Sequence, residues 1–205
     1  MLTSTLKKYK ELLSKVRKVL KMKSIDIVFP QNNEEEFIRV AKLLGTRELI
    51  FVYTLNTYKT YVSQEKGLVI KTGIVAQPKY VKEAKKKAGI VIVKSDPETD
   101  KMVIESLKPA IMYGFELQER KDFMHHRNSS LNHVLCHAMA ENNVAYGFSV
   151  GDLIAAPKEK QAVILGRMYQ NIMLAKKYKI KIILASFTSD PMLMRNLKDV
   201  LCLVD

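Results

Sequence analysis

Residues 144–186 read VAYGFSVGDLIAAPKEKQAVILGRMYQNIMLAKKYKIKIILAS and contain the unit from which the fold is predicted. A short apolar run, Val144 to Phe148, is followed by a helical segment, Lys158 to Tyr178, and by a second apolar run, Ile180 to Ser186. Both runs are nearly continuous in apolar residues, which is typical of parallel strands covered by helices. The stretch therefore predicts a strand, a crossover helix and a second, parallel strand.

The same alternation continues through most of the chain. We predict strands at residues 25–29, 48–53, 68–76, 89–93, 110–115, 144–148, 180–186 and 201–204. Between them we predict helices at residues 34–44, 56–64, 78–87, 99–107, 129–142, 158–178 and 191–199. Connections are short and no break in composition marks a linker, so residues 1–205 are expected to form a single domain. About eight strand–helix units favour an α/β fold, a TIM-barrel-like (β/α) barrel of about eight parallel strands. An open doubly wound sheet is the alternative.

Residues 1–24 precede the first predicted strand and carry basic side chains throughout. Their apolar residues recur at spacings of three and four, which predicts an N-terminal basic amphipathic helix; the apolar stripe is Leu6, Tyr9, Leu13, Val16 and Leu20. We expect this helix to pack by its stripe; an RNA-binding arm or a membrane-surface helix is the alternative. Because the chain ends at the eighth predicted strand, the helix is predicted to fill the place of the absent last barrel helix.

The composition is that of an ordinary globular protein, with 47% apolar and 27% charged residues, and with a strong basic excess. Thirty-four Lys and Arg against 21 Asp and Glu give a net charge of +13, which favours a polyanionic partner. Nucleic acid is the first expectation and an anionic membrane surface the second. Two distant cysteines, no signal peptide and no apolar run of about 18 residues predict a reduced, cytoplasmic protein that does not insert into a membrane.

Polar residues collect in the segments that follow the fifth, sixth and seventh predicted strands. In a parallel barrel such segments lie on one rim, where ligands are usually bound. This rim is predicted to carry Arg120, Lys121, His125, His126, Arg127, Ser149, Asp152, Ser186 and Thr188, with Arg195 nearby. Helices predicted to begin near Ser129 and Asp190 would point backbone N–H groups at the same side. A basic rim of this kind suits phosphate groups.

All four histidines lie between residues 125 and 137. His133 and His137 are four residues apart on the predicted helix and are therefore candidate metal ligands. Position 134 is Val instead of the Glu of an HExxH motif, and no third ligand is evident. A surface, hydrogen-bonding or RNA-stacking role is favoured over metal binding. Cys136 is expected to be a small semi-buried residue, because no base is placed beside it.

Two familiar phosphate-binding patterns are missing from the sequence. It contains no Walker loop and no strand-linked GxGxxG. Gly166, Arg167, Gln170 and Asn171 interrupt the otherwise apolar helix at 158–178. We interpret them either as a side facing the rim or a partner, or as ordinary packing and helix surface.

The segments HHRNSSLNHVLCHAMAENNVAYGFSVGDLI and GRMYQNIMLAKKYKIKIILASFTSDPMLMRNLKDVL resemble the archaeal and eukaryotic ribonuclease P protein component 3 family, the thirty-kilodalton-type subunit. The resemblance is strong from about Lys121 to Leu203 and continues colinearly, more weakly, back to Ile25. It implies a TIM-barrel-like subunit that assembles with a catalytic RNA, protein component 2 and other protein components. Such a complex removes 5′ leaders from precursor tRNA. The RNA performs the chemistry with bound Mg²⁺, so the resemblance implies no catalytic residue, metal or cofactor on the protein itself.

Several positions match the family residue by residue. Arg127, Ser129, Leu131 and Asn132 match its Arg-x-Ser-Gly-Leu-Asn segment, with Ser130 where the family has Gly. Other matches are Gly147, Phe148, Ser149, Asn171, Lys177, Tyr178, Ser186 and Arg195. The candidate RNA-binding residues are Lys108, Arg120, Lys121, His125, His126, Arg127, Lys177 and Arg195.

Two other functions remain open on the sequence. The fold also resembles the metal-dependent phosphoesterases of the polymerase-and-histidinol-phosphatase type, which carry His-x-His at the end of the first strand. Here Ile25 to Phe29 contains no histidine, and none occurs before residue 125. A purely structural interaction module, whose charge only keeps it soluble, is the third hypothesis.

Overall fold

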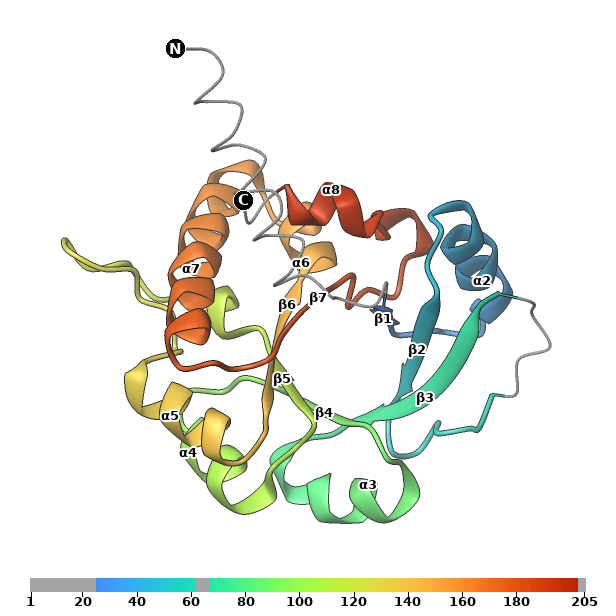
Figure 1. Cartoon of the computed structure of the whole chain (residues 1–205), viewed down its shortest axis with the longest axis horizontal. Helices are drawn as coiled ribbons and strands as arrows, with labels where there is room; N and C mark the ends of the chain where they lie inside the picture. The colour runs from blue at the N-terminus through green and yellow to red at the C-terminus, as the bar shows by residue number, and fades with distance from the viewer. Residues whose placement is uncertain (1–24, 62–66, 203–205) are drawn as a thin grey trace, which may run out of the picture.

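The computed structural model describes residues 25–61 and 67–202 and shows a ring of seven parallel strands (Figure 1). The strands are Ile25–Val28 (β1), Glu48–Tyr53 (β2), Val69–Val75 (β3), Val91–Lys94 (β4), Ile111–Tyr113 (β5), Ala145–Ser149 (β6) and Ile182–Ala185 (β7). They pair in sequence order from β1 to β7. This order confirms the predicted TIM-barrel-like class, because a doubly wound sheet reverses its strand order at a switch point.

Hydrogen bonds between residues 26–29 and 186–188, here called the seam, close the ring from β7 to β1. The Phe187 N–H donates to the Ile27 carbonyl at 2.7 Å, and the Phe29 N–H donates to the Thr188 carbonyl at 2.8 Å. The Asp26 carboxylate accepts from the Ser186 N–H at 2.6 Å and from the Ser186 hydroxyl at 2.8 Å. One buried side chain thus ties the first strand to the segment after the last.

Apolar side chains fill one layer inside the barrel and another between the strands and the helices. The inner layer consists of Ile27, Ile50, Val52, Ile92, Ile111, Tyr113, Ala145, Ala185 and Phe187. Neighbouring positions on the same strands, such as Met112, Tyr146 and Phe148, point outward into the helix layer. Both faces of the sheet are therefore buried, which explains the continuous apolar runs in the sequence.

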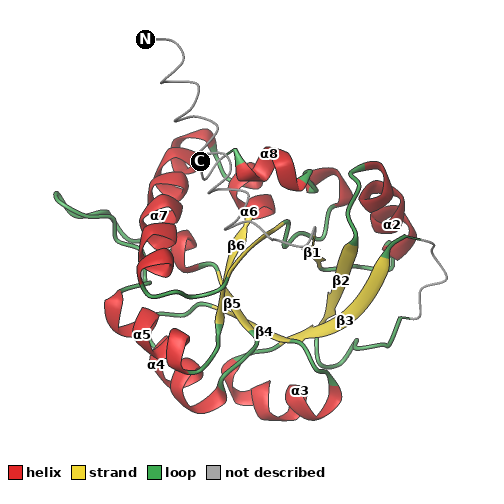
Figure 2. Cartoon of the chain, viewed as in Figure 1, coloured by secondary structure: helices red, strands yellow, loops and turns green. Residues whose placement is uncertain are grey.

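Helices surround the outside of the barrel (Figure 2). Their bounds are α2 (Glu34–Leu43), η1 (Pro78–Tyr80), α3 (Val81–Lys87), α4 (Asp100–Met102), η2 (Val103–Leu107), η3 (Phe115–Leu117), α5 (His133–Glu141), α6 (Val150–Ala155), α7 (Lys158–Lys177), η4 (Pro191–Leu193) and α8 (Leu197–Leu201). Within residues 25–61 and 67–202, no helix is both long and apolar enough to cross a membrane.

Several predicted helix boundaries were wrong, and for two of them a local hydrogen bond gives the reason. Of the helix predicted at 56–64, residues 56–61 form a turn followed by irregular chain, where Thr54 and Thr57 bond to each other, and residues 62–64 lie outside the described residues. Helix α5 begins at His133, not at residue 129, because the Asn132 side chain accepts from the N–H groups of Val134 and Leu135 at 2.9 and 3.0 Å. The helix predicted at 191–199 is two short pieces, η4 and α8, and α6 was not predicted at all.

The predicted eighth strand was also wrong where the structure describes it. Leu201 ends α8, and Cys202 lies in the turn that follows. Residues 203–204 of that predicted strand lie outside the described residues, as do residues 1–24 and with them the predicted N-terminal helix. The prediction that this helix completes the barrel stays a prediction.

Candidate nucleic-acid interface

Aromatic rings fill the mouth of the barrel at the carboxyl ends of the strands. Tyr113 stacks on Phe187 with ring centroids 4.7 Å apart, and Phe29 packs against both at 6.0 and 6.2 Å. Phe187 has a φ of 44°, which is rare for a bulky residue, and its N–H is held at the seam. The rings occupy the place where barrel enzymes bind their ligands.

Gly147 on β6 makes room for these rings. A Cβ atom at this position would lie 2.9 Å from Phe187 Cζ and 2.9 Å from Ile111 Cγ2. Both contacts are too short for a real side chain, so the mouth can be filled this tightly only beside glycine. This accounts physically for the glycine in the YGFS segment.

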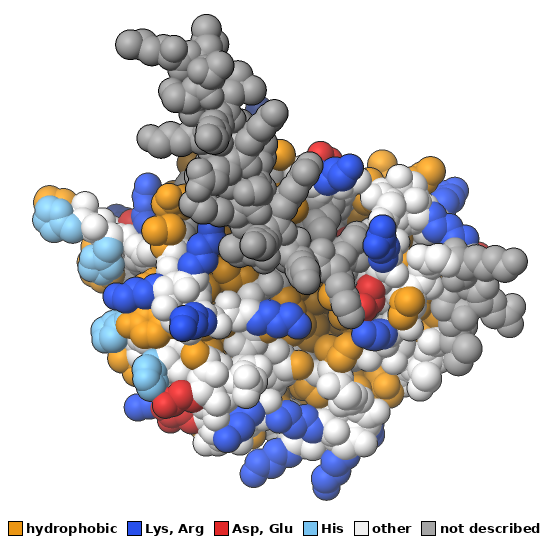
Figure 3. All heavy atoms as spheres, in the orientation of Figure 1, with side chains coloured by type: hydrophobic (Ala, Val, Ile, Leu, Met, Phe, Trp, Pro, Cys, Tyr) orange, Lys and Arg blue, Asp and Glu red, His pale blue; other side chains and the backbone are white. Residues whose placement is uncertain are grey.

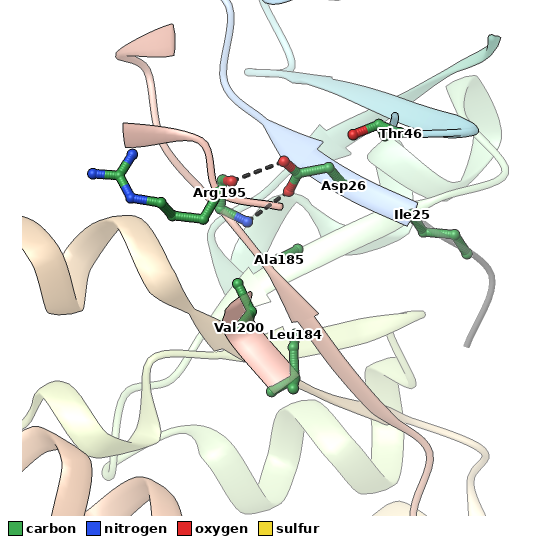
Figure 4. A pocket seen from close by; sticks show the side chains of 8 residues that line it. Ile25, Asp26, Thr46, Leu184, Ala185, Arg195 and Val200 are labelled. Carbon is green, nitrogen blue, oxygen red and sulfur yellow. Dashed lines mark hydrogen bonds between the residues drawn. The ribbon is translucent and has the colours of Figure 1, made fainter. Parts of the chain in front are cut away.

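The polar pocket at the seam is too small for a substrate. Its volume is about 10 Å³, close to the minimum for one water, and it is lined by Ile25, Asp26, Thr46, Leu184, Ala185, Ser186, Arg195 and Val200 (Figure 4). Burial raises the pKa of Asp26 to about 6, although hydrogen bonds from Ser186 and Ile27 favour its charged form. The carboxylate is used to close the barrel, and a catalytic pocket is not formed around it.

The described residues contain no group of three or more His, Cys, Asp and Glu side chains that could hold a metal ion. His133 and His137 are exposed on α5, where His137 Nδ1 lies 3.4 Å from Glu141 Oε2. Cys136 is fully buried, and burial raises its thiol pKa to about 11. Together with the aromatic mouth, these observations do not favour the phosphoesterase hypothesis.

Residues 118–128, here called the rim loop, project from the carboxyl end of the barrel beside α7 (Figure 1). Arg167 of α7 is only 3% exposed and holds the base of this loop. Its guanidinium donates to the Asp122 carboxylate at 2.8 Å, to the Gln118 carbonyl at 2.5 Å and to the Arg120 carbonyl. One buried arginine therefore holds one side chain and two backbone carbonyls of the loop.

A second set of contacts fixes Arg127, at the end of the rim loop. Its backbone N–H and carbonyl both pair with the Gln170 amide, each at 3.0 Å. Its guanidinium donates to Asp122 at 2.9 Å and lies against Gly166, where an added Cβ would be 3.0 Å from Arg127 Nε. Although burial opposes the charge, hydrogen bonds from Asn128, Arg167 and Arg127 keep the pKa of Asp122 below its usual value.

Beneath the rim loop lies a buried polar cluster. The Tyr146 hydroxyl donates to Glu116 Oε2 at 3.0 Å and accepts from Asn171 Nδ2 at 3.3 Å. Burial raises the pKa of Glu116 to about 7. Glu116 Oε1 and Asn171 Oδ1 are buried and have no hydrogen-bond partner among the described residues. The Glu116 carbonyl accepts from Arg167 at 3.3 Å, so this cluster and the loop clamp are one connected network.

The tip of the rim loop is exposed. Phe123 stacks on His126 with centroids 4.5 Å apart, and the side chains of Phe123 and Met124 are 57% and 92% exposed. Arg120, Lys121 and His125 are exposed beside them. Histidine side chains stand out on one side of the molecule in Figure 3. A rigid base thus carries a tip with cationic, imidazole and aromatic groups.

The other predicted RNA-binding residues lie elsewhere. Lys108 precedes β5 and Lys177 precedes β7, which places both at the amino end of the barrel, opposite the rim loop. Arg195 folds back on the Met192 and Met194 carbonyls at 2.8 and 2.7 Å. The structure therefore brings together the five predicted residues between 120 and 127 but separates them from Lys108 and Lys177.

Sequence reasoning missed the residues that build the loop, above all Arg167, Asp122 and Glu116. The polar interruption of α7 did carry a signal. The interpretation as a side facing the rim is confirmed for Gly166, Arg167 and Gln170, which contact the rim loop. For Asn171 the packing interpretation holds, because it is buried and donates to the Tyr146 hydroxyl. Ser130, where the resembled family has Gly, needs no positive φ. Its hydroxyl lies 3.0 Å from that of Ser95, within hydrogen-bonding distance.

The fold and this surface define a basic (β/α) barrel with a filled mouth and an external, loop-built polar surface. No protein-family model matches the chain. A curated relative, "Ribonuclease P protein component 3" of Methanosarcina acetivorans, is 27% identical over 129 residues, which are 61% of this chain and 54% of the relative. The match thus spans about half the length of that relative. It confirms the resemblance inferred from the sequence.

A solved structure shows the same fold. The chain is similar to a chain in the "cryo-EM structure of archaeal Ribonuclease P with mature tRNA", with a TM-score of 0.64 and 18% sequence identity. The alignment covers 85% of this chain and 78% of that one. At this level of identity the likeness concerns the fold.

Proposed function

We propose that this chain is a protein subunit of ribonuclease P, an RNA-based endonuclease that matures the 5′ end of precursor tRNA. The observation that carries the proposal is the filled mouth of a strongly basic barrel. Tyr113, Phe187 and Phe29 occupy the usual catalytic position, while net charge +13 and the rim loop favour a polyanion. The likeness to a curated component 3 supports the same function.

In this proposal the RNA component, with its own Mg²⁺, performs the chemistry. The chain supports that RNA together with protein component 2 and other protein components in the cytoplasm, and precursor tRNA is the substrate of the whole complex. The protein itself would bind no cofactor. Its contribution is a preformed surface, since Arg167 and Gln170 already hold the rim loop in place.

The rim loop is the first proposed RNA contact. Arg120, Lys121, His125 and His126 supply cationic or hydrogen-bonding groups, and the Phe123–His126 stack offers a flat face on which an unpaired base can stack. Arg127 has its side chain half exposed but is engaged with Asp122, so its main effect is to hold the loop. Lys108, Lys177 and Arg195 are proposed as contacts outside this loop.

Reconstitution tests the function. The RNA component and the other protein subunits are assembled with and without this chain, and cleavage of precursor tRNA is followed. We expect the chain to raise the cleavage rate and to be inactive without RNA. Stoichiometric metal in the purified protein, together with phosphoesterase turnover by the protein alone, would instead support the metallohydrolase hypothesis.

A variant with Arg120, Lys121, His125 and His126 replaced by alanine tests the rim loop. RNA affinity should fall and the dependence of log K on log salt should become shallower by about one to two. A control variant, Lys82→Gln with Lys86→Gln, removes two charges from exposed positions of α3. Equal salt dependence in the wild type and the rim-loop variant would contradict this site.

A further inference from the structure

Three helix-to-strand turns at the amino end of the barrel share one backbone geometry. Gly45, Asn143 and Lys179 each adopt a left-handed conformation, with φ of 69°, 55° and 57°. In each turn the N–H of the next residue donates to the carbonyl oxygen of the residue five positions earlier. These bonds join Thr46 to Ala41, Val144 to Met139 and Ile180 to Ala175, all at 2.9 Å. Lys108 ends the η2 turn in the same conformation, with φ of 48°.

Glycine and asparagine are the residues that suit this position, because a left-handed backbone brings Cβ close to the carbonyl oxygen. The chain uses them at Gly45 and Asn143. At Lys108 and Lys179 it has lysine, which is conformationally unfavourable there. Backbone strain of this kind occurs at functional positions more often than elsewhere. The left-handed conformation therefore gives lysine no conformational advantage over glycine or asparagine at either position.

The two lysines belong to one surface. The pairing of β5 with β6 and of β6 with β7 places Asn143 between Pro109 and Lys179 in neighbouring turns. Strands are spaced about 4.8 Å apart, so the turns of Lys108 and Lys179 are roughly 10 Å apart. Lys177 and Lys181 flank Lys179, and all four lysines are exposed.

The charges of this surface are largely uncompensated. Within the described residues Lys108, Lys179 and Lys181 form no ion pair, and Lys177 lies over the Tyr178 ring at 5.6 Å. Glu105 lies three residues before Lys108, and Glu141 lies two residues before Asn143 in the neighbouring turn, where it faces His137. Figure 3 shows the excess of Lys and Arg over acidic side chains on one face of the molecule.

We infer that the amino end of the barrel at β5–β7 is a second RNA-backbone contact, made by Lys108 and Lys179 and supported by Lys177 and Lys181. This inference rests on the proposed function. It places phosphate contacts at the end of the barrel opposite the rim loop, so that a folded RNA contacts both ends of one subunit.

The chemistry of this surface favours a phosphate backbone over a protein. Residues 107–110, 142–144 and 178–181 contain none of the large exposed apolar side chains that anchor protein interfaces. They offer ammonium groups together with the exposed amide of Asn143. Such groups bind phosphate and ribose oxygens without reading a base sequence.

The test exploits the left-handed conformation. In the full chain, Lys108→Gly with Lys179→Gly removes two charges while relieving backbone strain, so the melting temperature should stay equal or rise. The probe is the labelled ribonuclease P RNA. From the salt dependence of two phosphate contacts, affinity should fall about 10- to 30-fold at 0.15 M salt, and the slope should become shallower by about 1.4 to 1.8.

Two matched variants make the result specific. Lys108→Arg with Lys179→Arg keeps charge and strain and should bind like the wild type. The α3 control, Lys82→Gln with Lys86→Gln, loses the same charge and should change affinity much less.

Three outcomes would overturn the inference. An unchanged salt slope in the double glycine variant is the first, and an equal loss in the α3 control is the second. The third is weaker binding of partner protein with unchanged RNA affinity, which would assign the surface to a protein. Failure of the proposed function is distinct, because the wild-type chain would then neither bind the RNA nor stimulate cleavage.

Discussion

Replacing Glu116 by Gln is expected to remove a pH dependence from the stability of this protein. Burial raises the pKa of Glu116 from 4.5 to about 7, against hydrogen bonds from its own N–H, Tyr146 and Ser149 that favour the charged form. The unfolded chain therefore loses its proton near pH 4.5 and the folded chain near pH 7. Between these values the folded state binds more protons, so the free energy of unfolding falls as pH rises.

The magnitude follows from the same two pKa values. At about 1.4 kcal/mol per pH unit, the stability contribution lost between pH 4.5 and 7 is roughly 3 kcal/mol, and no more is lost above pH 7. Glutamine stays neutral at every pH and also offers a donor where Glu116 Oε1 has no partner among the described residues. The free energy of unfolding of Glu116→Gln, relative to that of the wild type, should therefore rise by close to this amount between pH 5 and pH 8.

Urea denaturation at pH 5, 6, 7 and 8 measures the effect directly. Asp26 and Asp100 also have pKa values raised by burial, to about 6, so each wild-type profile contains their contributions below that pH. Comparing variant with wild type at each pH cancels them. Glu98→Gln, at an exposed position, is the control and should follow the wild type. Parallel profiles for Glu116→Gln and the wild type would refute the reasoning.

Two further substitutions test the clamp and the filled mouth. Arg167→Met should destabilise the protein by roughly 3 to 5 kcal/mol, because it leaves Asp122 and loop carbonyls without their buried partner, and trypsin should then cut the rim loop faster. Wild-type proteolysis kinetics in this variant would show that α7 does not hold the loop. Gly147→Ala should cost about 1 to 3 kcal/mol by urea denaturation, since the new methyl meets Phe187 and Ile111 at 2.9 Å. A stability change below about 0.5 kcal/mol would mean that the mouth is loosely packed.

The fold class was predictable because parallel strands buried on both faces leave continuous apolar runs. The runs at 48–53 and 182–185, for example, contain few polar residues. What failed were boundaries set by single hydrogen bonds. The Asn132 side chain caps the first turn of α5 and so sets where this helix begins. After β2, Thr54 and Thr57 bond to each other in a turn at the point where a helix was predicted. Such local bonds compete with propensity and leave little trace in hydrophobic periodicity.

The candidate interface was predictable as a basic loop but not as a built structure. His125, His126 and Arg127 are recognisable from charge, whereas Arg167 lies 40 residues beyond Arg127 in the chain and meets the loop only through the fold. The left-handed conformations of Lys108 and Lys179 are also invisible in the sequence, because lysine carries no preference for them. Both the rim loop and the turns of Lys108 and Lys179 are basic, and only their positions at opposite ends of the barrel distinguish them.

The seam has a consequence for how the chain folds during synthesis. Asp26 and Ser186 are 160 positions apart, so the bond between them forms only after nearly all of the described chain has left the ribosome. Until then the inward side chains of β1 lack their neighbours from β7, and the nascent barrel is open along one edge. Closure over so long a stretch of chain is expected to slow folding, and β7 is the strand that brings the two sides of the seam together.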